Sequence, residues 1–222
     1  MKHYIITRFS ILDADFKYFK LVCNNTKADY TNQLFDKQRL DFKFNVFDKM
    51  TYPSIVNQSY TDYEWLIYTS SFLPLEYKTK LATYETDKIK ILYVDNFKQF
   101  YGHLNQFLAD KTDYVTLRLD DDDGLDCDFL KKLDTYSLNK GEIVSFPKGR
   151  SFTIENNSVI VGDTYTHPLV AIGLAAIGFN VHSAGDHNRV GEKYKVNVDD
   201  SNEFYFICGS EYCDTKRKFT KK

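Results

Sequence analysis

Four consecutive aspartates, residues 120–123, are the part of this 222-residue sequence best suited to chemistry. They follow an apolar, strand-like stretch at residues 114–119 and precede Gly124. Neighbouring carboxylates repel one another, so a cation is expected among them. Mg²⁺ and Mn²⁺ prefer oxygen ligands, usually one or two carboxylates together with substrate phosphates. The cluster therefore favours a divalent-metal site for a diphosphate.

Three other interpretations of the acidic cluster compete with a metal site. A solvated acidic turn that leads into a helix capped by Asp126 or Asp128 stays open, although the preceding apolar strand and the following glycine disfavour it. A calcium loop of the EF-hand type fails on register: with Gly124 as the turn glycine, its first and twelfth ligand positions fall on Leu119 and Leu130. A phosphatase with an aspartyl nucleophile would need supporting lysine and threonine motifs, which are not found.

One basic residue is expected next to the cluster. Strand alternation places Arg118 on the face that also carries Asp120, opposite the apolar side chains of Val115 and Leu117. Arg118 is therefore in position to neutralise part of the acidic charge or to bind a ligand phosphate.

Strands and helices alternate over the first 130 residues. The apolar patterns predict strands at residues 3–7, 65–69, 88–94 and 114–119, and helices at residues 54–60, 75–84 and 101–109. Thr51 is predicted to cap the first of these helices, with Pro53 in its first turn. This alternation predicts an α/β fold with a largely parallel sheet covered on both faces. Ligands of such sheets bind beyond the carboxyl ends of the strands, where the aspartates lie.

The second half of the chain has a different pattern. Residues 142–165 alternate in short apolar runs, with turns at residues 147–149 and at Asn156 and Asn157, which predicts β-strands and a hairpin. The apolar run at residues 169–179 has about half the length of a membrane span and is expected to be a buried segment.

Composition limits the class of protein. The 29 basic and 31 acidic residues give a net charge of −2, which argues against a dedicated nucleic-acid binder. The sequence shows no repeat, linker or signal peptide, so a single cytoplasmic domain over residues 1–222 is expected. No CxxC pair is present, and reduced thiols fit the four cysteines better than a zinc ribbon: Cys23, Cys127, Cys208 and Cys213.

Five segments, in their order, resemble the rhamnosyltransferase family of the GT-A glycosyltransferases. They are "ITRFSI" (residues 6–11), "RL" (39–40), "PSIVNQ" (53–58), "YEWLI" (63–67) and "LRLDDDDGLDCDFL" (117–130). The resemblance implies the GT-A fold, a Rossmann-like three-layer sandwich of the nucleotide-diphospho-sugar transferases with a mostly parallel central sheet. It covers residues 1–130 well, which would be the nucleotide-sugar-binding half. Residues 131–215 would then form the acceptor-side half, ahead of a basic tail at residues 216–222.

The resemblance implies a metal-dependent glycosyltransferase. It would move a sugar, such as rhamnose or another deoxyhexose, from a nucleotide-diphosphate donor to a glycan or lipid-linked acceptor, with Mn²⁺ or Mg²⁺ as cofactor. The basic tail is expected to be solvated and disordered, and the alternative is that it rests on anionic lipid at the inner membrane face, where a lipid-linked acceptor would be met. The alternative is a non-catalytic relic of the same fold that binds a nucleotide sugar or carbohydrate without turnover.

Roles for individual residues follow from the resemblance. The donor-binding residues would be Thr7, Arg8, Arg39, Arg118, Asp120 and Asp123. The metal ligands would be Asp120, Asp122 and His187. Asp186 is the candidate base, which an inverting reaction needs to take the proton of the acceptor hydroxyl.

Two departures from the family pattern put parts of this site in doubt. After "YEWLIY" the family usually carries an acidic residue, whereas this chain has Thr69, Ser70 and Ser71. Cys208 stands where the family often has a histidine, and a thiolate is a soft ligand for a hard metal. The contact to the base or ribose and the third metal ligand are therefore left open.

Overall fold

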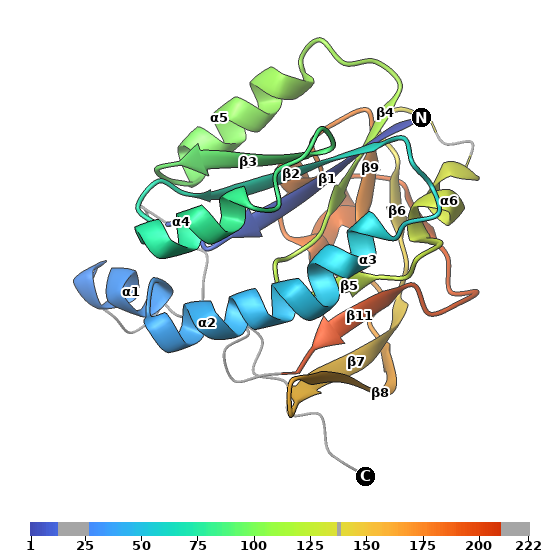
Figure 1. Cartoon of the computed structure of the whole chain (residues 1–222). Coiled ribbons are helices and arrows are strands. Elements are labelled where there is room, and N and C mark those ends of the chain that lie inside the picture. Colours follow the sequence, from blue (N-terminus) through green and yellow to red (C-terminus); the bar gives the residue numbers. More distant parts are fainter. Residues whose placement is uncertain (13–26, 137–138, 210–222) are drawn as a thin grey trace.

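The computed structural model describes residues 1–12, 27–136 and 139–209. Its centre is a seven-stranded sheet with the order β10-β6-β9-β4-β1-β2-β3 (Figure 1). Four of its strands are mutually parallel neighbours, as the alternating pattern predicted. They are β1 (Lys2–Phe9), β2 (Tyr63–Ser70), β3 (Ile89–Val94) and β4 (Tyr114–Arg118). The predicted α/β class with a mostly parallel central sheet is thus confirmed.

Helices cover both faces of this parallel part (Figure 1). Ile5 of β1 packs in a cluster with Leu40 of α2 and Leu81 of α4, whereas Ile6 packs with Phe100 of α5 on the opposite face. The helical segments of this half are α1 (Lys27–Leu34), α2 (Lys37–Val46), η2 (Phe47–Thr51), α3 (Tyr52–Val56), α4 (Leu75–Ala82) and α5 (Phe97–Leu108). Among the described helices, none is long and apolar enough to cross a membrane.

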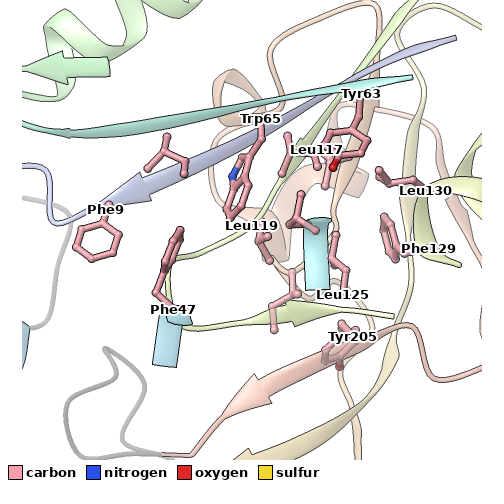
Figure 2. Close-up of a cluster of buried hydrophobic side chains, with 14 of the residues drawn as sticks. Phe9, Phe47, Tyr63, Trp65, Leu117, Leu119, Leu125, Phe129, Leu130 and Tyr205 are labelled. Carbon is pink, nitrogen blue, oxygen red and sulfur yellow. The ribbon is translucent and has the colours of Figure 1, made fainter. Parts of the chain in front are cut away.

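The larger core cluster lies between the sheet and the α2–α3 segment (Figure 2). Trp65 is fully buried, with its ring stacked at 5.5 Å on that of Phe47. Its indole N–H donates to the Thr7 hydroxyl (2.9 Å), so the one polar atom of the ring is satisfied. Leu117 and Leu119 belong to the same cluster, on the face that strand alternation predicted.

The helix predicted at residues 54–60 is corrected. α3 follows η2 directly and ends at Val56, so α2, η2 and α3 form one helical stretch. Thr51 has helical φ −63° and ψ −54° and makes no side-chain cap. Its hydroxyl donates to the Asp121 carbonyl (3.2 Å) instead. Burial of Ile55 against the sheet favours continuity over the local capping signal, because packing supplies most helix stability in proteins.

The remaining strands of the central sheet come from the second half. β9 (Ala175–Ile177) is antiparallel to both β4 and β6 (Ile143–Ser145), and β6 is parallel to β10 (Val196–Val198). β9 packs into one core cluster through Ala175 and into another through Ala176. The segment predicted to be buried at residues 169–179 therefore contains a short strand that is covered on both faces, which fits the apolar side chains there.

A second sheet has the order β5-β11-β7-β8 and lies below the first in Figure 1. The predicted hairpin is confirmed, and its two-residue turn has positive φ at Asn156 (48°) and Asn157 (66°), as tight hairpin turns require. The strands are β5 (Gly124–Leu125), β7 (Lys148–Glu155), β8 (Ser158–Thr166) and β11 (Tyr205–Cys208). Short helical segments complete the chain: α6 (Phe129–Asp134), η3 (Val181–Ala184) and η4 (His187–Glu192).

One buried histidine is expected to make stability depend on pH. His3 is fully buried, stacks on Tyr60 (4.7 Å) and lies 3.6 Å from Asp134. Burial lowers the pKa of His3 to about 4, while Asp134 opposes this shift. Between that pKa and about 6.5, the unfolded chain takes up a proton that the folded chain does not. The contribution of His3 to stability is therefore complete above pH 6.5 and is lost as pH falls toward 4.

We expect His3→Phe, which keeps a ring on Tyr60 but cannot titrate, to remove this part of the pH dependence. Urea unfolding at pH 7 and pH 4 should show the wild type losing about 2–3 kcal/mol more than the variant. Equal losses in the two proteins would mean that His3 is protonated without cost in the folded state.

Candidate active site

A pocket with a cavity volume of about 210 Å³ lies beyond the carboxyl ends of β1 and β4. Its apolar lining includes side chains from elements far apart in the sequence: Ile11, Tyr30, Leu34, Phe97, Ile172 and Ile207. Its charged lining comprises four cations and four carboxylates: Arg8, Arg39, Lys43, Arg118, Asp120, Asp121, Asp122 and Asp123. Opposite charges in equal number, held in one concave site, are suited to binding a charged ligand.

Asp120 is held by two arginines. Arg118 donates to both carboxylate oxygens, from Nε (3.2 Å) and from Nη2 (2.8 Å), and Nη2 of Arg8 lies 3.5 Å away. Burial by itself would raise the pKa of Asp120, but the two guanidinium groups outweigh it and hold this pKa below its usual range. Asp120 is therefore an anion that fixes Arg118 and Arg8 at the edge of the pocket.

Asp121 and Asp122 share the ammonium group of Lys43. Nζ of Lys43 lies 2.9 Å from Oδ1 of Asp121 and 2.8 Å from Oδ2 of Asp122, and the lysine side chain is only 3% exposed. Burial raises the pKa of Asp121 to about 6, although Lys43 opposes the rise. The α2 helix thus places one cation between two successive carboxylates of the acidic segment.

Asp123 ties the acidic segment to the second sheet. Its Oδ1 accepts from the backbone N–H of Cys208, the last residue of β11 (3.3 Å). Burial, together with the nearby charges of Asp122 and Asp120, raises the pKa of Asp123 well above its usual value. The segment is consequently anchored at both ends, by β4 before it and by β5 and β11 after it.

Two arginines of the pocket each have a buried N–H group without a hydrogen-bond partner among the described residues. Nη1 of Arg39 donates to the hydroxyl of Ser10 (3.1 Å) and to the carbonyl of Leu34 (2.9 Å), which fixes the guanidinium group. The buried Nε of Arg39 has no hydrogen-bond partner among the described residues, and the same holds for Nε of Arg8. Buried N–H groups without a hydrogen-bond partner are rare in folded proteins, and a bound ligand is one way to supply the partner.

The structure brings most of the predicted site residues together. Those that line the pocket are Arg8, Arg39, Arg118, Asp120, Asp122, Asp123 and His187. Thr7 does not line it, because its side chain is fully buried against Trp65. Asp186 is exposed outside the lining and accepts from the N–H of Asn188 at the start of η4 (3.0 Å). The predicted basic tail lies outside the described residues.

The three predicted metal ligands are each engaged by protein groups. Both oxygens of Asp120 accept from arginine, and Oδ2 of Asp122 accepts from lysine. Nδ1 of His187 donates to the carbonyl of Leu169. These three side chains do not converge on a common point within the described part of the chain. As arranged, they do not form a metal site of three protein ligands.

Three side chains of types that can bind a metal meet at another place in the described residues. Asp126, Cys127 and Asp128 bring their ligand atoms within 4.8 Å of one another. This group lies outside the pocket lining, Cys127 and Asp128 are exposed, and Asp126 and Asp128 accept hydrogen bonds from the protein. It has the features of a surface turn before α6.

An acidic side chain that follows the next strand lies beside the end of β2. Thr69 and Ser70 are fully buried, and the hydroxyl of Ser71 donates to the carboxylate of Asp95, which follows β3. The parallel register of β2 and β3 brings these two strand ends together. Asp95 itself lies outside the pocket lining.

Lys43 was missed by the sequence analysis. It lies in the stripe Leu40, Phe44 and Phe47, which are spaced as one face of a helix and are buried. A lysine within such a stripe must find an anionic partner or lose its charge. That pattern is the signal that could have identified it, although its partner Asp121 lies 78 residues away.

A family described as "Putative rhamnosyl transferase" matches residues 2–221. The chain belongs to this family. No curated protein matches the sequence of this family member.

Two solved structures of S. aureus TarS (residues 1–349) share the fold of this rhamnosyl transferase family member. One has a TM-score of 0.50 at 10% sequence identity. That match covers 94% of this chain and 60% of the TarS chain. The other, a complex with UDP-GlcNAc, has a TM-score of 0.52 at 11% sequence identity. That match covers 95% of this chain and 59% of the TarS chain. This chain therefore spans about 60% of the TarS chains that it matches.

Proposed function

We propose that this chain transfers a sugar from a nucleoside-diphosphate donor to a hydroxyl group of an acceptor. The observation that carries the proposal is the set of four cations around the acidic segment: Arg8, Arg39, Lys43 and Arg118. Arg8 and Arg39 each retain a buried N–H without a partner among the described residues. Arginine and lysine are the side chains that bind diphosphate oxygens.

The transfer step needs cations beside the diphosphate, which Arg8, Arg39, Lys43 and Arg118 can supply. The bond between the anomeric carbon and the diphosphate oxygen breaks, and its electron pair stays on the diphosphate. The acceptor hydroxyl oxygen forms the new bond to that carbon and gives up its proton to a base. Fixed cations aimed at the leaving oxygens stabilise the charge that develops there. Asp186, the base predicted from the sequence, remains a prediction.

The proposed sugar rests on the family, and the proposed donor rests on the similarity in fold. The family description supports rhamnose or a related deoxyhexose as the sugar. The TarS complex with UDP-GlcNAc supports a nucleotide sugar as the donor. A glycan or lipid-linked acceptor, a dependence on Mn²⁺ or Mg²⁺, a cytoplasmic location and contact of the tail with the inner membrane face remain predictions of the sequence.

The test is release of nucleoside diphosphate from a panel of UDP-, dTDP- and GDP-sugars, with and without Mn²⁺. We expect release from one donor class, lowered at least tenfold in Asp122→Asn, because the neutral amide no longer balances Lys43. The matched control is Asp87→Asn, the same substitution at an exposed turn before β3, which should leave the rate unchanged.

Binding without turnover would overturn the proposed transfer. If one nucleotide sugar binds tightly but no diphosphate is released with any acceptor extract, the chain is a binding protein of the same fold. If no nucleotide sugar binds, the pocket is not a donor site.

A further inference from the structure

The position of Lys43 in the acidic segment has a chemical consequence. Its ammonium group lies within 2.9 Å of Asp121 and 2.8 Å of Asp122, so it bridges two carboxylates as a bound cation would. The lysine lies on the buried face of α2, in the apolar stripe with Leu40 and Phe44. Packing therefore holds this cation in place.

A divalent ion would have to displace this ammonium group to bridge Asp121 and Asp122. Displacement would leave a buried lysine without its carboxylate partners, which is strongly unfavourable. Asp120 offers no easy alternative, since both of its oxygens accept from Arg118. Asp120, Asp121 and Asp122 thus each have a basic side chain of the protein as a partner.

We propose that Lys43 is a tethered cation that takes the place of a divalent metal ion between Asp121 and Asp122, so that donor binding and transfer proceed without added metal. The inference rests on the proposed function, because it assigns the charge on which the diphosphate is bound. Lysine acts on phosphate as a point charge, and the arginines Arg8, Arg39 and Arg118 add to it from the same lining. Lys43 thereby positions the acidic segment and supplies charge at once.

The first test compares nucleoside diphosphate binding with and without metal. UDP, dTDP and GDP are titrated into the wild-type protein by calorimetry, once in EDTA and once with Mn²⁺. We expect the dissociation constant of the nucleotide that binds to differ less than threefold between the two conditions. A loss of binding in EDTA of tenfold or more would overturn the inference.

The second test measures Mn²⁺ alone, by electron paramagnetic resonance of the free ion. The wild type should bind it weakly, whereas Lys43→Met should bind it at least tenfold more tightly, because Asp121 and Asp122 lose their internal cation. Lys43→Arg keeps the charge and should behave as the wild type. Lys80→Met is the matched control, because it breaks an exposed pair with Asp48 and should not gain affinity for Mn²⁺.

Tight, stoichiometric Mn²⁺ binding by the wild type that Lys43→Met leaves unchanged would overturn the inference. If Lys43→Met does not fold, the wild-type titrations and Lys43→Arg still decide it. Absence of nucleotide binding by the wild type in both conditions would instead contradict the proposed function. The Mn²⁺ titrations do not depend on nucleotide, so the two failures are distinguishable.

Discussion

Replacing Arg118 by glutamine is expected to weaken nucleoside diphosphate binding about 100-fold and to lower kcat/KM for transfer at least as much. The substitution removes one cation from the pocket and leaves Asp120, whose two oxygens Arg118 held, with Arg8 at 3.5 Å as its remaining cationic partner. Truncating one partner of such a pair costs about 2–5 kcal/mol, and about 1.4 kcal/mol corresponds to tenfold in affinity. Asp120 is 29% exposed, so the lower part of that range applies. Calorimetric titration gives the affinity directly.

Weaker nucleotide binding by Arg118→Gln could come from the lost positive charge or from a destabilised fold, and these two causes must be separated. The double variant Arg118→Gln/Asp120→Asn also removes the carboxylate that Arg118 held, so its melting temperature should return toward the wild-type value while nucleotide affinity stays low. Arg189→Gln is the matched control, because Arg189 pairs with Glu192 at 2.8 Å on an exposed part of η4. It should change affinity less than about threefold, as expected for a surface pair. Wild-type affinity in Arg118→Gln would exclude Arg118 from the donor site.

Replacing Trp65 by alanine is expected to lower the free energy of unfolding by about 4 kcal/mol. Its ring is fully buried between the α2–α3 segment and the sheet, at 5.5 Å from Phe47 and 6.4 Å from Tyr52 (Figure 2). The substitution also removes the N–H that donates to Thr7. Domains of this kind are stable by only about 5–15 kcal/mol, so a large share of the stability would be lost. The loss of stability can be measured by urea unfolding followed by circular dichroism. Tryptophan fluorescence cannot be used, because Trp65 is the only tryptophan and the variant lacks it.

Two further variants assign the loss in Trp65→Ala to its causes. Trp65→Phe keeps an aromatic ring but removes the N–H, so it should cost clearly less than Trp65→Ala. Leu75→Ala removes an apolar side chain that is 78% exposed and should change stability by about 0.5 kcal/mol or less. If Trp65→Ala were no more damaging than Leu75→Ala, the core between α2 and the sheet would not support the fold.

Local patterns predicted several of the elements, but not all of them and not all of their limits. The strand that ends at Arg118, the hairpin at Asn156 and Asn157, and the buried run around β9 were all predicted from alternation, turn residues and apolar length. The helix expected at residues 54–60 was displaced, because Thr51 bonds to the Asp121 carbonyl rather than to its own helix. A helix-capping signal acts only within one helical turn. Here the hydrogen bond from Thr51 to Asp121, 70 residues away in the sequence, took the place of the cap.

The sequence by itself determined the α/β class and placed an acidic segment at the carboxyl end of β4, next to Arg118, because periodicity and strand alternation are local properties. Only the tertiary structure decided which cations meet that segment. Arg8 reaches it from β1 and Lys43 from α2, whereas Thr7 faces the core and Asp186 faces solvent. Packing of helices and sheets brings charged side chains that are tens of residues apart in the sequence within hydrogen-bonding distance. Local sequence patterns carry no information about which of these side chains will meet.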